Sequence, residues 1–125
     1  MTTIKSYTDF WQSLKLAEFL SSKSADMHYY MWNKPLTSSE NYERASFING
    51  NRNDIPCWSL AALLNIIPKR INNNGLRTYI DENYFNIWYY EFGYSVNNTL
   101  PNIKMESAVD ACYEMIIGLH ERNLL

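Results

Sequence analysis

The sequence predicts an α+β fold, with about three helices packed on a small antiparallel sheet of three to five strands in a single domain, residues 1–125. Apolar residues recur at helical spacing near both ends of the chain, which predicts helices there. Between them, two strand-like runs rich in aromatic residues flank a short polar turn, which predicts an antiparallel hairpin. At 46% hydrophobic and 19% charged residues, the chain has the composition of a globular domain that needs neither a disulfide nor a metal to fold.

The first helix is expected at residues 9–22. Thr8 or Asp9 can cap it, because either side-chain oxygen can accept from the free amides of the first turn. A strand follows at residues 27–32 and ends before Pro35, which lacks a backbone donor. The polar stretch from Thr37 to Asp54 is expected to be a long surface loop, with room for a short strand at residues 45–49.

Two further helices are expected, at residues 58–67 and 105–123. Ser59 can cap the first of them and Pro68 ends it. This helix is so uniformly apolar that it must be surrounded by protein. The last helix is amphipathic, with an acidic opposite side at Glu106, Asp110, Glu114 and Glu121. Its apolar stripe consists of Val109, Cys112, Met115, Ile116 and Leu119.

The hairpin is expected to join strands at residues 76–81 and 84–94 through a turn at Glu82 and Asn83, after an earlier turn at residues 72–75. A two- or four-residue loop places Ile80 opposite Phe85, Thr78 opposite Ile87 and Leu76 opposite Tyr89. A three-residue loop would pair Ile80 with Tyr84 and leave Phe85 and Ile87 beside Arg77. Burial favours the first register, since each of these two side chains gains about 1.5–3 kcal/mol when it leaves water.

Because side chains alternate along a strand, this register divides the hairpin into two faces. The first face is apolar enough to be core and carries Leu76, Thr78, Ile80, Phe85, Ile87 and Tyr89. The second carries the candidate binding residues Arg77, Tyr79, Tyr84, Trp88 and Tyr90, together with Asp81 and Asn86. Either the long loop or a second copy of the chain covers this second face, or the face is an exposed patch with the Tyr, Trp and Arg composition of interaction hot spots.

Sequence motifs for catalysis are missing: there is no phosphate-binding glycine loop, HExxH, CxxC or GxSxG. We therefore expect no catalytic residue, cofactor or metal site, although an enzyme stays open if the fold gathers His28, Cys57, Cys112 or Glu91 into a pocket. Within the last helix, Cys112 and His120 stand about two turns apart, too far for a nucleophile and its base.

The compartment is expected to be the cytoplasm. Cys57 and Cys112 each lie in an apolar stretch and are interpreted as buried, reduced thiols. The N-terminal residues lack the apolar run of a signal peptide, and no stretch approaches a membrane span, so no membrane partner is expected.

Three segments, residues 15–32, 56–68 and 108–125, resemble a group of small uncharacterised proteins associated with prophages and mobile elements of gut bacteria. The resemblance covers about two fifths of the chain. It implies a bacterial, intracellular, phage-derived protein and carries no activity, cofactor or catalytic residue.

The function expected from these observations is that of a non-catalytic protein-interaction module, for example a phage-derived modulator of a host protein. Its partner would be another protein or a second copy of the chain, bound through the aromatic face. The alternative is a single-stranded nucleic-acid binder that stacks bases on Trp88 and Tyr90. A net charge of −2 gives no general attraction to phosphate, so nucleic acid is the less expected partner.

Overall fold

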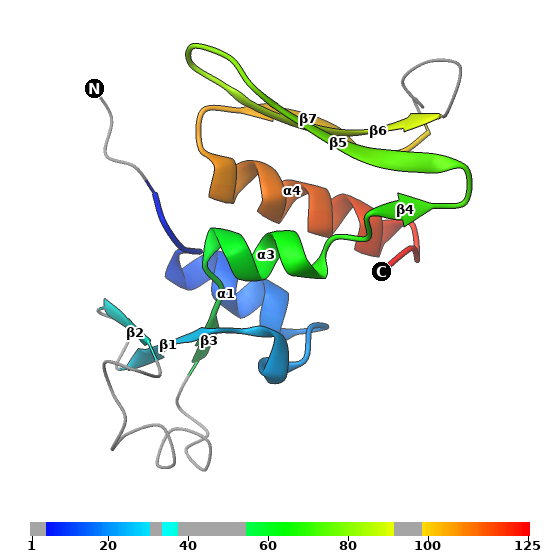
Figure 1. The fold of residues 1–125 in the computed structure, drawn as a ribbon. Coiled ribbons are helices and arrows are strands. Elements are labelled where there is room, and N and C mark those ends of the chain that lie inside the picture. Colours follow the sequence, from blue (N-terminus) through cyan, green and yellow to red (C-terminus); the bar gives the residue numbers. More distant parts are fainter. Residues whose placement is uncertain (1–4, 31–33, 38–54, 92–98) are drawn as a thin grey trace. The chain divides into compact units, whose positions relative to one another are not determined.

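The fold is described from a computed structural model, which defines residues 5–30, 34–37, 55–91 and 99–125. The chain divides into two compact units: Ser6–Ala62 form one, and Met1–Lys5 with Leu63–Leu125 form the other. We call these the N-terminal unit and the C-terminal unit. The α+β class is confirmed, because the described residues contain three α-helices and two antiparallel sheets (Figure 1). The strands are thus shared between two sheets, where one was expected.

In its described residues, the N-terminal unit contains one α-helix, a short 3₁₀ helix and a small sheet of order β2-β1-β3. Its elements are α1 (Phe10–Ala17), η1 (Ser22–Ser24), β1 (Met27–Tyr30), β2 (Lys34–Thr37) and β3 (Ile55–Cys57). Asp9 caps α1, where its side chain accepts from the Gln12 backbone N–H while the Gln12 side chain accepts from the Asp9 N–H. This reciprocal arrangement fixes the start of the helix.

Helix α1 ends at Ala17, earlier than expected, and the Glu18 and Phe19 N–H groups donate to the carbonyls of Lys15 and Leu16, three residues back, which tightens the last turn. The Ser21 side chain then accepts from the Lys23 N–H and begins η1. Pro35 does not end the strand region as expected. It lies inside β2 opposite Tyr29, and β2 is an edge strand among the described strands, the kind of strand in which proline is tolerated.

Strand β3 was not expected, because three residues ahead of an apolar helix give too short a pattern to recognise. It pairs with β1, with Met27 opposite Cys57. Three expected features lie outside the described residues: the end of the first strand at residues 31–32, most of the loop at 37–54 with its strand at 45–49, and residues 92–94 of the hairpin.

In the residues that the structure describes, the C-terminal unit has a four-stranded antiparallel sheet of order β4-β5-β6-β7 and one long helix (Figure 1). Its elements are β4 (Arg70–Ile71), β5 (Asn74–Ile80), β6 (Phe85–Glu91), β7 (Asn102–Met105) and α4 (Ala108–Glu121). Helix α4 packs on β6 and β7. The expected apolar stripe of α4 is confirmed: Val109, Cys112, Met115, Ile116 and Leu119 are all fully buried.

Helix α4 begins three residues later than expected because residues 102–105 form β7. Ser107 caps the helix, accepting from the Asp110 N–H at 3.1 Å. The acidic side of α4 is not uniformly solvated, since Asp110 forms an ion pair with Lys5 at 2.7 Å.

Helix α3 (Leu60–Ile66) spans the boundary between the two units. Ser59 caps it as expected, accepting from the Ala62 N–H at 3.2 Å. The expectation that protein surrounds this helix is wrong, because only Leu63 is fully buried within it while Ala61 is exposed. The other apolar residues of α3, Leu60, Ala62, Leu64 and Ile66, are half-buried.

Candidate functional site

The hairpin of β5 and β6 has the expected register. Ile80 lies opposite Phe85, Thr78 opposite Ile87, and Leu76 opposite Tyr89. Asp81 shapes the turn, because its carboxylate accepts from the backbone N–H groups of Asn83 and Tyr84. The two faces deduced from the sequence therefore exist as faces of the sheet.

Only the β6 half of the expected core face is fully buried. Phe85 is 8% exposed and Ile87 and Tyr89 are 0% exposed, whereas Thr78 is exposed and Ile80 is 76% exposed. The expectation that Ile80 points into the core is thus wrong. The reason is that α4 packs on β6 and β7, so the outer half of β5 lies beyond the cover that this helix provides.

The opposite side of this sheet carries the candidate residues, and we call it the reverse face. Sheet pairing aligns Arg77, Trp88 and Asn102 in one cross-strand row. A second row aligns Tyr79, Asn86 and Lys104, and a third joins Arg70, Gly75 and Tyr90. Within this unit, no described helix or strand lies over the reverse face (Figure 1).

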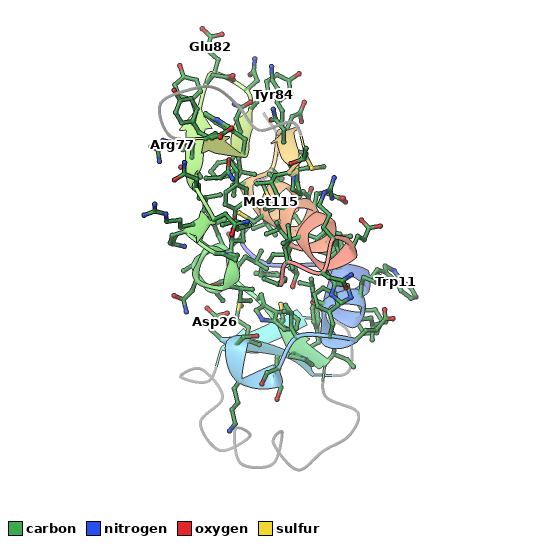
Figure 2. The ribbon with its side chains drawn as sticks, turned by 90° about the vertical axis from the view of Figure 1, so that its right-hand side faces the viewer. Trp11, Asp26, Arg77, Glu82, Tyr84 and Met115 are labelled. Carbon is green, nitrogen blue, oxygen red and sulfur yellow. The ribbon has the colours of Figure 1, made fainter. Side chains whose placement is uncertain are left out.

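Cations and aromatic rings are interleaved on the reverse face. The Arg77 guanidinium lies 5.9 Å from the centre of the Tyr90 ring, and Lys104 Nζ lies 4.7 Å from that of Tyr84. In such pairs the electrostatic attraction of the ring face holds the charged group over the ring. Tyr79 is 59% exposed and Tyr84 is 38% exposed. Figure 2 shows Arg77 and Tyr84 towards the end of the C-terminal unit where Glu82 marks the hairpin tip.

Trp88 occupies the centre of this face and is half-buried. Its indole Nε1 is buried and, among the described residues, has no hydrogen-bond partner. A buried donor without a partner costs about 1–3 kcal/mol, so indole N–H groups are usually paired. Trp88 therefore contributes ring area to the face at some cost to the stability of the fold.

The five predicted residues are brought to one face, and the structure adds Arg70, Asn102 and Lys104 to them. Asn102 and Lys104 were missed because they depend on β7, and Arg70 joins this face through β4; neither segment was expected as a strand. The strict alternation in Asn102-Ile103-Lys104-Met105 is the signal that could have revealed β7. The reverse face thus holds the cations Arg70, Arg77 and Lys104, with the Asp81 carboxylate at the hairpin tip.

Residues considered for catalysis are not assembled in this way. In the N-terminal unit, Cys57 lies opposite Met27 while His28 lies opposite Pro56, so the two side chains point to opposite faces of that sheet. In α4, Cys112 is buried and His120 is exposed. Burial raises the pKa of Cys57, and it raises the pKa of Cys112 to about 12. Both thiols are free and buried, a state that disfavours the nucleophilic thiolate.

A buried polar cluster surrounds Cys57, and it is structural. Thr8 is its centre: its Oγ1 lies 2.8 Å from Ser13 Oγ and accepts from the Trp58 N–H at 3.1 Å. The Tyr29 hydroxyl donates to the Thr8 carbonyl at 2.7 Å, and burial raises the pKa of Tyr29. These contacts tie the segment before α1 to β1 and to the residues at the end of β3.

Among the described residues, no three His, Cys, Asp or Glu side chains are grouped so as to hold a metal ion. None of the helices in the described part of the chain is long and apolar enough to cross a membrane. Comparison with family models, curated proteins and solved structures returns no match to this chain.

Proposed function

We propose that this protein is a non-catalytic protein-interaction module and that the reverse face is its binding surface. The observation that carries the proposal is the clustering of Arg77, Tyr79, Trp88 and Tyr90 on one sheet face over which no described element of the unit lies. Arg, Trp and Tyr are the residues that most often dominate the energy of protein interfaces.

The face is suited to this role by its geometry. Its rings stand on a sheet that α4 supports from behind, so little side-chain or backbone ordering is needed on binding. Guanidinium and ammonium groups held over rings offer both charge and flat apolar area. A partner that presents carboxylates beside apolar side chains would complement both.

Affinity capture with matched variants tests the proposal. Three baits are compared on bacterial lysate: the wild type, the double variant Arg77→Ala/Tyr79→Ala, and Trp11→Ala as control. Trp11 is 73% exposed on α1 in the N-terminal unit, so it controls for loss of an exposed aromatic residue (Figure 2). We expect a protein that the wild type and Trp11→Ala retain and that the double variant loses by roughly thirtyfold or more, which corresponds to one hot-spot contact of about 2 kcal/mol. Equal retention by all three baits, or no retained protein, would contradict it.

A second candidate function is the binding of single-stranded nucleic acid. The observation that favours it is the presence of Arg70, Arg77 and Lys104 among the rings, because bases stack on aromatic residues while cations neutralise phosphates. A single-stranded oligonucleotide should then quench tryptophan fluorescence at low salt and less so at high salt. Quenching that persists in Trp88→Phe but disappears in Trp11→Phe would exclude the reverse face as its site.

The setting of the proposed function is the bacterial cytoplasm, and the partner is a host protein that a phage-derived protein modulates. The resemblance of residues 15–32, 56–68 and 108–125 to prophage-associated proteins supports the setting. Two free, buried thiols are consistent with a reducing compartment. Fractionation of cells that express the tagged chain tests the compartment: recovery with the membrane or secreted fraction would contradict it.

A further inference from the structure

The outer edge of β5 is a second surface whose structure points to a partner. Strand β4 pairs only with Asn74 and Gly75, so residues 77–80 have β6 on one side and no described strand on the other. Figure 1 shows β4 beside only one end of β5. Tyr79 and Ile80, two of the most exposed large apolar residues of the described chain, lie on this free segment at 59% and 76% exposure.

Two hydrogen bonds establish which backbone groups face outward. The Leu76 N–H donates to the Lys69 carbonyl on the β4 side, and the Asp81 N–H donates to the Tyr84 carbonyl on the β6 side. Because the direction of backbone groups alternates along a strand, the N–H and C=O groups of Thr78 and Ile80 point outward, and those of Arg77 and Tyr79 point towards β6. The free edge thus offers two donors and two acceptors.

We propose that a second copy of this chain pairs with this edge, antiparallel and about a twofold axis at Tyr79. In this register Thr78 of one copy lies opposite Ile80 of the other, and each such pair exchanges two backbone hydrogen bonds. All four outward groups of each copy are then satisfied. Leu76, whose N–H is already bonded to Lys69, is not required.

The side chains of this register are complementary to themselves. Tyr79 meets Tyr79 of the other copy at a pair without hydrogen bonds, where side chains approach most closely. Arg77 of each copy lies opposite Asp81 of the other, so two pairs of opposite charge flank the tyrosines. Asp81 Oδ1 is engaged by the turn, and Oδ2 lies 3.5 Å from Asn86 Nδ2, at the outer limit of a hydrogen bond, so it can accept from an arginine.

The twofold axis runs perpendicular to the sheet, so both reverse faces lie on the same side of the joined sheets. Each copy contributes its four strands, and the candidate binding residues of the two copies become continuous. The backbone hydrogen bonds of this contact belong to the β5 edge and do not depend on what the reverse face binds, although the contact shares Arg77 and Tyr79 with that face. An unpaired strand edge with exposed apolar residues is the kind of surface that strand addition covers.

Sedimentation equilibrium of the whole chain from micromolar to millimolar concentration tests the pairing. We expect the average mass to rise from 14.7 kDa towards twice that value. Thr78→Pro removes an outward donor that the fold itself does not use, and it should weaken association by roughly tenfold or more, since each copy loses one interface hydrogen bond. A mass that stays at 14.7 kDa over the whole range would overturn the proposal.

Cysteine crosslinking tests the register. Tyr79→Cys should form an intermolecular disulfide on mild oxidation, because the twofold axis places the two Cβ atoms within reach of one another. Tyr84→Cys is the matched control: it exposes a thiol on the same face but lies on the far side of the hairpin from this edge, and it should not crosslink. Association that Thr78→Pro leaves unchanged, or crosslinking of Tyr84→Cys in preference to Tyr79→Cys, would place the contact elsewhere and refute the proposal.

Discussion

Ile87 and Ile80 lie on the same face of one hairpin, yet substituting them should have very different consequences. Ile87 is 0% exposed and lies between Thr78 of β5 and Ile103 of β7, whereas Ile80 is 76% exposed near the hairpin tip. Replacing each by alanine removes the same three carbon atoms. Each substitution lowers the free energy of unfolding by some amount, and the difference between these two amounts measures the effect of burial.

The expected magnitudes follow from burial. At about 0.8 kcal/mol per buried carbon, Ile87→Ala loses about 2.4 kcal/mol of transfer free energy, and the remaining cavity raises the cost to roughly 3–4 kcal/mol. Ile80→Ala should change the free energy of unfolding by about 0.5 kcal/mol or less, as for other exposed positions.

Urea unfolding followed by circular dichroism measures both values. With a urea dependence of about 1.5–2 kcal/mol per molar, Ile87→Ala should lower the midpoint by roughly 2 M and Ile80→Ala by less than about 0.4 M. Equal losses for the two variants, or a larger loss for Ile80→Ala, would refute the assignment of core to the β6 half of the face.

Three further predictions follow from buried groups and caps. Burial raises the pKa of Tyr89 from 10.0 and that of Cys112 from 9.0, each to about 12. As the pH rises, the unfolded chain therefore loses these protons before the folded chain does. The free energy of unfolding should then fall between about pH 9 and pH 12. Measured by urea unfolding, the free energy of unfolding of Tyr89→Phe should fall less steeply with pH than that of the wild type. Near neutral pH the variant should be about 1 kcal/mol less stable, because it lacks the hydrogen bond to the Pro68 carbonyl. A pH dependence identical to that of the wild type would count against the raised pKa of Tyr89. Ser107→Ala removes the cap of α4 and should lower the free energy of unfolding by about 1 kcal/mol, measured by thermal or urea unfolding. Glu114 is exposed, so Glu114→Ala should be nearly neutral. A larger loss of stability for Glu114→Ala than for Ser107→Ala would be inconsistent with this cap. A thiol reagent at pH 8 should modify neither cysteine until urea unfolds the chain, and rapid labelling of the native protein would contradict their burial.

The hairpin register and the stripe of α4 were predictable because both depend on local periodicity. Alternation over β5 and β6 is long enough to decide which residues share a face, and the helical spacing from Val109 to Leu119 is equally unambiguous. Ser59 was recognisable as a cap, and the first cap was narrowed to Thr8 or Asp9, because capping depends on a few adjacent residues; the structure shows that Asp9 is the cap.

The elements that were missed depend on distant partners. Strands β3 and β4 contain three and two residues, and such short segments become strands only by pairing with β1 and β5. The membership of Arg70 and Lys104 in the reverse face has the same cause, because sheet pairing with β4 and β7 brings them beside the predicted residues. The exposure of Ile80 also could not be foreseen, since it depends on which strands α4 covers.

The reverse face and the free edge both depend on the register of the hairpin, and nuclear Overhauser spectroscopy measures that register directly. Leu76, Thr78 and Ile80 face Tyr89, Ile87 and Phe85 at pairs without hydrogen bonds, where backbone α-protons approach most closely. We expect a strong α-proton cross-peak between Thr78 and Ile87. A cross-peak joining Thr78 to Asn86 in its place would shift the strands by one residue, move Trp88 away from Arg77, and contradict both proposed surfaces.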